Sequence, residues 1–284
     1  MHRFHCAALA AVALVGFASV ASAADMPMKA APMVASVAAY NWTGFYVGGN
    51  AGWINATGDT NTDAAILSTG TGPVNGINLA ASATNQMGNR SSGFIGGGQF
   101  GYNYQISPAW VAGIEADIQG STLNGNANAT LITDTGPFWQ TTTTVSSRLN
   151  YFGTLRARGG FLATPALLLY GTGGLAYGGV NSSTTINFAN TGGAVPGSTS
   201  GSFSSTRAGW TAGGGVEWMF VTNWSAKLEY LHYDLGSVTY ATGGYAVDVG
   251  PTSFCCEGIV SVATSTTVHF KGDIVRLGLN YKFN

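Results

Sequence analysis

Apolar and polar side chains alternate with a period of two along several segments of about 11 to 14 residues. The clearest segment is residues 93–106, in which Phe94 and Phe100 share one face while Gln99 and Asn103 share the other. Such alternation is typical of β-strands with one apolar and one polar face. Helical periodicity is absent after the N-terminal region, so the pattern predicts an all-β fold.

The same alternation recurs along the chain and predicts eight strands. They are residues 43–54, 93–106, 110–120, 149–161, 167–180, 207–220, 224–235 and 270–283. The connections alternate between tight turns and long stretches rich in Thr, Ser, Asn and Gly. The turns are 107–109, 163–166 and 221–223, and the long stretches, which we expect to be loops, are 55–92, 121–147, 181–206 and 236–269. This arrangement predicts an eight-stranded antiparallel up-and-down transmembrane β-barrel with four long extracellular loops.

The charged residues of these strands fall on the polar face, opposite the apolar side chains. A soluble β-sandwich has the reverse arrangement, with apolar residues inside and charges in water. In a barrel that crosses a membrane, the polar face is the interior, so we expect the charges to form a structural, salt-bridged network there. Its predicted members are Glu115, Asp117, Arg156, Arg158, Glu217, Lys227, Glu229 and Arg276.

Aromatic residues gather near both ends of the predicted apolar faces. Trp42, Tyr104, Trp110, Phe161, Trp218, Trp224 and Phe283 lie toward one end, and Trp53, Phe94, Tyr151 and Trp210 toward the other. Two such girdles are expected where a barrel meets the two membrane interfaces.

Composition excludes several other classes of protein. Only 8% of the 284 residues are charged, against roughly 25% in an ordinary soluble domain. The hydrophobic content of 45% and the mean hydropathy of +0.18 oppose intrinsic disorder. The net charge of −1 provides no basic surface for a phosphate backbone, so nucleic acid is not an expected partner.

The N-terminus has the pattern of a secretory signal peptide. Arg3 precedes an apolar run over residues 6–20, and the small residues Ala21 and Ala23 flank Ser22 as in a signal peptidase site. We expect residues 1–23 to be removed, 24–41 to be a flexible periplasmic lead-in, and 42–284 to form the barrel. The expected location is the outer membrane of a Gram-negative bacterium.

Sites for a cofactor, a metal or catalysis are not predicted. Glycines of residues 96–101 satisfy G-x-G-x-x-G, but no helix follows them, as a dinucleotide site requires. Cys255 and Cys256 are adjacent and do not have metal-ligand spacing. His232 is followed closely by Asp234, but no G-x-S-x-G nucleophile motif accompanies it, so a barrel-embedded lipid hydrolase is the weakest hypothesis.

Five blocks resemble a known family. They are residues 41–49 (NWTGFYVGG), 113–117 (GIEAD), 150–156 (NYFGTLR), 170–177 (YGTGGLAY) and 227–230 (KLEY). These resemble the OmpA-like outer-membrane β-barrel proteins of alphaproteobacteria, often called outer membrane immunogenic or porin-family proteins. The resemblance implies an eight-stranded barrel with surface-exposed loops and, in some members, hemin binding or a porin label.

The leading functional hypothesis is a non-enzymatic outer-membrane protein that supports envelope integrity and displays surface loops. An eight-stranded barrel has an interior just wide enough for side chains to fill, which favours this hypothesis over a wide pore. The alternative is a small-solute porin or a hemin-binding transport protein. Candidate iron ligands for hemin lie in or beside the fourth long stretch: His269, Tyr240, Tyr245, Cys255 and Cys256.

The expected partners are outer-membrane lipids and the barrel-assembly machinery, which would engage the C-terminal strand ending at Phe283. The sequence does not identify an external partner for the loops.

Overall fold

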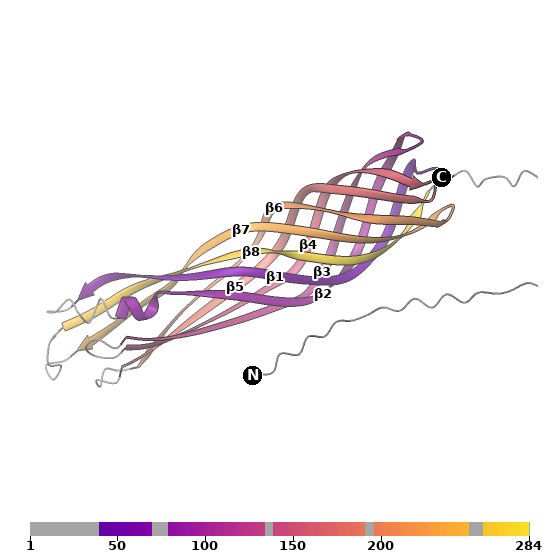
Figure 1. The fold of residues 1–284 in the computed structure, drawn as a ribbon. Helices are drawn as coiled ribbons and strands as arrows, with labels where there is room; N and C mark the ends of the chain where they lie inside the picture. The colour runs from indigo at the N-terminus through magenta and orange to yellow at the C-terminus, as the bar shows by residue number, and fades with distance from the viewer. Residues whose placement is uncertain (1–39, 70–78, 134–138, 191–195, 250–257, 284) are drawn as a thin grey trace, which may run out of the picture. The chain divides into compact units, whose positions relative to one another are not determined.

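The computed structural model describes residues 40–69, 79–133, 139–190, 196–249 and 258–283. Within them, eight antiparallel strands follow one another around a closed barrel in chain order (Figure 1). They are β1 (Gly44–Thr69), β2 (Asn85–Ser107), β3 (Trp110–Ile132), β4 (Trp139–Thr164), β5 (Leu167–Asn190), β6 (Gly197–Val221), β7 (Trp224–Val249) and β8 (Gly258–Lys282). The predicted eight-stranded up-and-down antiparallel barrel is confirmed. The predicted signal peptide and most of the predicted lead-in lie outside the described residues.

The two ends of the barrel are distinguished by their connections. Tight turns at residues 108–109, 165–166 and 222–223 join β2 to β3, β4 to β5 and β6 to β7, as predicted. We call this end the turn end and the opposite one the loop end. β1 pairs with β8 from Tyr46 and Lys282 to Thr69 and Val260, which closes the barrel. In the part of the chain that the structure describes, no helix is long and apolar enough to cross a membrane.

The prediction of four long loops is wrong. The strands continue toward the loop end through most of residues 55–92, 121–147, 181–206 and 236–269. The strands therefore contain 23 to 26 residues, whereas about 9 to 11 suffice to cross a bilayer. A Thr- and Ser-rich composition does not distinguish a loop from a strand here. Thr is a good strand former, and the inward hydroxyls bond to one another, as between Oγ1 of Thr62 and Oγ1 of Thr266 at 3.2 Å.

Toward the loop end, the barrel wall divides along two seams. β2 and β3 pair only as far as Ile95 and Ser121, and β6 and β7 only as far as Trp210 and Asp234. Beyond these pairs, the described residues of β2 no longer pair with those of β3, and those of β6 no longer pair with those of β7. The wall thus continues as two four-stranded sheets, β7-β8-β1-β2 and β3-β4-β5-β6.

Side chains join the two sheets where the backbone ladder is missing. The hydroxyl of Tyr240 on β7 bonds to those of Ser182 and Thr184 on β5, at 2.9 and 2.7 Å. Nη2 of Arg207 on β6 donates to the carbonyl oxygen of Ser237 at 3.0 Å. A buried apolar core fills the space between the sheets near the loop end: Leu79, Ala80, Ala83, Trp139, Ile186, Phe188, Tyr245, Val247, Val260 and Val262. The division of the wall therefore produces a second core outside the predicted membrane-crossing segments.

The outward face is apolar and carries most of the predicted girdle residues, including Trp53, Phe94, Trp110 and Trp218, each more than half exposed. Trp42 is a correction, since only 1% of it is exposed and it lies inside the barrel. There, Nε1 of Trp42 donates to the carbonyl oxygen of Pro165 at 3.0 Å, a bond that the lipid face does not offer.

Leu149 departs from strict alternation along β4. Counting in twos from Tyr151 would place Leu149 on the outward face, but Leu149 is 3% exposed and points inward. The pairing register between β4 and β5 shifts between Leu149 and Tyr151. This bulge adds one residue and reverses the faces beyond it.

Candidate functional site

The predicted charged residues come together inside the barrel, in the half nearer the turn end. β3, β4, β6, β7 and β8 all contribute, and no member is more than 5% exposed. We call this group the charged layer; it comprises Glu115, Asp117, Arg156, Arg158, Glu217, Lys227, Glu229 and Arg276. Its four carboxylates balance its four cations. The alternation of each strand positions these side chains, because inward residues occur at every second position.

Arg156 lies at the centre of the charged layer and contacts three carboxylates. Its Nη2 lies 2.5 Å from Oε1 of Glu115 and 3.0 Å from Oδ2 of Asp117, and its Nη1 lies 2.9 Å from Oε1 of Glu229. Nη2 of Arg276 binds two of the same groups, at 2.8 Å from Oδ2 of Asp117 and 2.6 Å from Oε2 of Glu229. The two guanidinium groups thus join carboxylates from β3 and β7 across the interior.

The remaining cations complete the pairing. Nζ of Lys227 donates to both oxygens of Glu115 at 2.7 and 2.8 Å. Nη2 of Arg158 lies 2.5 Å from Oε2 of Glu217, while the guanidinium of Arg158 stacks 4.1 Å from the ring centre of Tyr170. Every carboxylate of the charged layer therefore has at least one cationic partner.

Neutral side chains that the predicted network did not include supply further hydrogen bonds. The hydroxyl of Tyr46 donates to Glu115 at 2.7 Å, that of Tyr170 to Glu229 at 3.0 Å and that of Ser225 to Glu217 at 2.5 Å. Nδ2 of Asn280 also donates to Glu217, at 2.9 Å. The inward parity of all four residues in their strands is the sequence signal that places them beside the charged layer.

These contacts describe a neutralised structural group rather than an acid–base pair. Burying ions in a medium of low dielectric costs several kcal/mol each unless partners and hydrogen bonds compensate. Each ion here is held by partners from other strands, so a change in one residue leaves its partners uncompensated. The layer can therefore fix the strands relative to one another and fill the lumen.

Apolar layers lie on both sides of the charged layer. On the turn-end side, the buried residues are Trp42, Val111, Leu162, Leu168, Tyr170 and Met219. On the loop-end side, they are Ile54, Ile95, Leu123, Leu149, Phe152, Ala176, Val180, Leu231, Tyr233, Leu235 and Ile274. A solute moving along the axis would meet these three layers in series.

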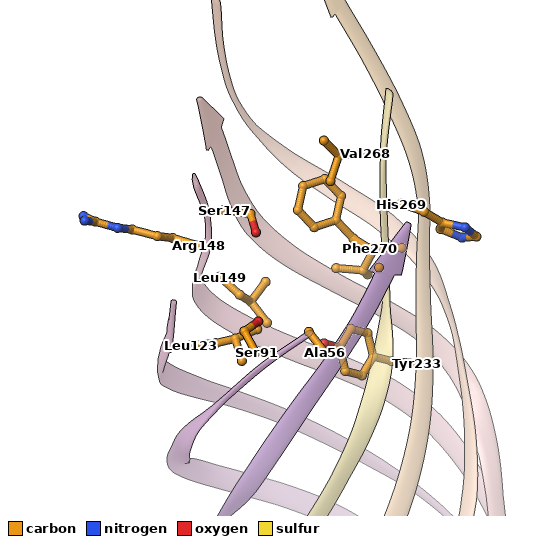
Figure 2. Close-up of a pocket in the computed structure, with 12 residues that line it drawn as sticks. Ala56, Ser91, Leu123, Ser147, Arg148, Leu149, Tyr233, Val268, His269 and Phe270 are labelled. Atoms are coloured by element: carbon orange, nitrogen blue, oxygen red, sulfur yellow. The ribbon is translucent and has the colours of Figure 1, made fainter. Parts of the chain in front are cut away.

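A small cavity adjoins the loop-end apolar layer (Figure 2). Leu123, Leu149, Tyr233 and Phe270 border it, and its volume is ≈ 30 Å³. This is room for about one or two water molecules, and a lining of this kind offers few polar partners to hold them. The long side chain of Arg148 extends away from the cavity. A hemin group does not fit such a space.

The candidate iron ligands are not brought together. Nε2 of His269 lies 3.1 Å from Oδ1 of Asp234. The hydroxyl of Tyr240 on β7 is instead hydrogen-bonded to that of Ser182 on β5. Tyr245 stacks on Phe188 at 4.5 Å, and burial raises the pKa of its phenol, which disfavours the phenolate form that binds iron. Cys255 and Cys256 lie outside the described residues.

The two histidines among the described residues, His232 and His269, form separate pairs with aspartates. Nδ1 of His232 lies 2.9 Å from Oδ1 of Asp273, and His269 contacts Asp234. Neither pair has a serine nucleophile among the hydrogen-bond partners that these residues show. Within the described residues, no group of three or more His, Cys, Asp or Glu side chains is arranged to hold a metal ion.

Comparison with known proteins gives one family match along nearly the whole chain. A family model described as "Outer membrane protein beta-barrel domain" matches residues 10–283. The "31 kDa outer-membrane immunogenic protein" of Brucella melitensis biotype 1 is 35% identical over 278 residues, which cover 97% of this chain and 98% of the relative. The protein of the same name from Brucella suis biovar 1 has the same identity and coverage.

Solved structures show weaker likeness. The outer membrane protein OprG from Pseudomonas aeruginosa has 15% identity and a TM-score of 0.42, with coverage of 85% of this chain and 97% of OprG. The outer membrane protease OmpT from Escherichia coli has 10% identity and a TM-score of 0.34, with coverage of 84% and 97%.

Proposed function

Because the chain belongs to the family of outer-membrane β-barrel proteins of Gram-negative bacteria, we propose that it is a non-enzymatic barrel with a closed lumen. In this proposal, it supports the integrity of the envelope and presents the loop end to the outside of the cell. The displayed part is the pair of four-stranded sheets rather than four long loops.

The observation that carries this proposal is the filling of the interior. The charged layer is compensated within itself, and the apolar layers on both sides contain few groups that would hydrate a passing solute. Opening a path would separate ion pairs in a medium of low dielectric, which costs several kcal/mol for each ion. A structural role follows more directly from this arrangement than passage of solutes does.

The proposed orientation rests on the connections. Outer-membrane barrels keep short turns on the periplasmic side and longer segments outside. Each tight turn here contains two residues, at 108–109, 165–166 and 222–223. The relative from Brucella melitensis is named as immunogenic, and surface display of the two sheets would give this chain the same kind of exposure.

The proposed assembly partner is the barrel-assembly machinery, with β8 and its last aromatic residue as the contact. Phe283 is half exposed, and its amide donates to the carbonyl oxygen of Phe45 at 2.8 Å. The final strand thus ends with an outward aromatic side chain next to the first strand.

A deletion strain tests the proposed function. We expect loss of the protein to raise sensitivity to detergents and entry of a large dye, and the intact gene to restore resistance. Slower uptake of small solutes with no change in detergent sensitivity would contradict the proposal and support the porin alternative. Saturable binding of hemin by the purified protein, with a shifted absorption band, would support the hemin-binding alternative.

A further inference from the structure

Two outward arginines lie just beyond the girdle of aromatic residues nearer the loop end. On β2, Arg90 lies four residues beyond Phe94, and on β4, Arg148 lies three residues beyond Tyr151. At about 3.3 Å of rise per residue along tilted strands, both are roughly 8 to 12 Å outside the aromatic side chains. That is the level of lipid headgroups when the aromatics lie at the membrane interface.

Arg90 lines an open groove of ≈ 570 Å³ on the outer surface across the β2–β3 seam. The other lining residues supply hydroxyl, amide and small side chains: Asn55, Ala56, Thr57, Ser91, Ser92 and Asn124. Thr57 is the direct cross-strand partner of Arg90. The groove thus combines one exposed guanidinium with several neutral hydrogen-bond donors and contains no carboxylate.

Arg148 lines a second groove, of ≈ 420 Å³, over β4, β5 and β6. Its lining is again rich in hydroxyl and amide groups: Ser146, Asn181, Ser182, Ser183, Ser202, Phe203 and Ser204. Asn124 of the first groove is the cross-strand partner of Arg148. The two grooves therefore adjoin each other across β3.

Charge on this side of the barrel is uncompensated. Among the described residues, the ion pairs do not include Arg90 or Arg148, whereas Lys271 at a similar level on β8 faces Asp59 at 4.0 Å. The neighbouring carboxylates Asp234 and Asp273 lie on β7 and β8, where His269 and His232 contact them. The side formed by β2, β3 and β4 is thus the one that favours an anion.

We propose that the Arg90 and Arg148 grooves bind the phosphate groups of an anionic outer-leaflet lipid. Guanidinium forms bidentate, charge-assisted hydrogen bonds with phosphate, and hydroxyl and amide groups complete the shell. The lipid, rather than free phosphate, is the proposed source because both grooves open at headgroup level beside an apolar face that accepts acyl chains. The inference rests on the proposed orientation, since it requires the loop end to face outward.

Native mass spectrometry of the purified full-length protein in detergent tests the proposal. The probe is bisphosphorylated lipid A, with enzymatically dephosphorylated lipid A and inorganic phosphate as the comparison ligands. We expect lipid A to bind and the dephosphorylated form to bind about tenfold more weakly, since charge-assisted bonds would be lost. The double variant Arg90→Gln/Arg148→Gln should lose affinity for lipid A to the same extent.

Matched variants separate the grooves from a general effect of charge. Lys271→Gln removes a positive charge at the same level but outside both grooves, and it should leave the affinity unchanged. Arg90→Lys/Arg148→Lys should retain part of the binding. The proposal is overturned if Arg90→Gln/Arg148→Gln binds lipid A like the wild type, if Lys271→Gln weakens binding equally, or if inorganic phosphate competes at equimolar concentration. A wrong orientation would instead appear in protease mapping on intact cells, so the two failures are distinguishable.

Discussion

Arg156 shows how one side chain can hold several strands together. It reaches from β4 to Glu115 and Asp117 on β3 and to Glu229 on β7. A buried cation that contacts three carboxylates stabilises the fold mainly because it keeps them from being unpaired. Leaving one buried ion unpaired destabilises the fold by far more than an intact ion pair stabilises it.

Replacing this guanidinium tests its contribution. We predict that Arg156→Ser lowers the free energy of unfolding by about 3 to 5 kcal/mol, because three carboxylates lose a partner at once. Urea unfolding in detergent, together with gel mobility before and after boiling, measures the change. The control is Arg148→Ser, an exposed arginine on the same strand, which should change stability by less than about 0.5 kcal/mol. Equal effects of the two substitutions would contradict the assigned role of the charged layer.

Parity along the strands predicts the inward charges well but fails where the backbone departs from regular alternation. Glu115, Asp117 and Arg156 could be placed because their strands alternate without interruption in that region. The inward position of Leu149 could not be predicted, because the bulge beside it changes which face the side chain occupies and no residue type in the sequence indicates that bulge. Trp42 is a different case, because it has the same parity as the inward Tyr46, and its bond to the carbonyl oxygen of Pro165 fits that inward position.

The strands themselves extend beyond the apolar region that sequence patterns identify. In the loop-end half, several inward positions are Thr and Ser, such as Thr143 and Thr184, which are buried. Hydropathy does not distinguish an inward hydroxyl from one in a surface loop, so strand length could not be predicted. Which strand pairs lose their ladder depends on long-range packing, and the seams could not be predicted at all.

Hydrogen exchange tests the two seams. Beyond Ile95 on β2 and Trp210 on β6, the backbone groups that face the seam lack ladder partners. We predict that every second amide of residues 85–93 and 197–209 exchanges faster than amides of residues 260–268 on β8, which is paired on both sides. The comparison needs residue-resolved exchange by NMR on the folded protein in detergent. Uniform protection across all eight strands would show that the wall is continuous.

For the whole molecule, orientation follows from which end external protease reaches. We predict that protease added to intact cells cuts within residues 70–78, 134–138, 191–195 or 250–257, the connections at the loop end, and spares residues 121–132 and 197–206. The spared segments are strands, and paired backbone does not enter a protease active site readily. Peptide mapping identifies the sites, and cells with permeabilised outer membranes are the control. Cleavage confined to 108–109 or 222–223 on intact cells would mean that the barrel is inverted.

In the proposed function, the compensated charges and the apolar layers on either side close the lumen of the barrel. Planar-bilayer recording of the purified, refolded wild-type protein measures this directly. We predict no stable large conductance, with only rare small openings, and more frequent openings for Arg156→Ser/Arg158→Ser because the charged layer loses two of its four cations. Reproducible wide channels from the wild-type protein would contradict a closed lumen.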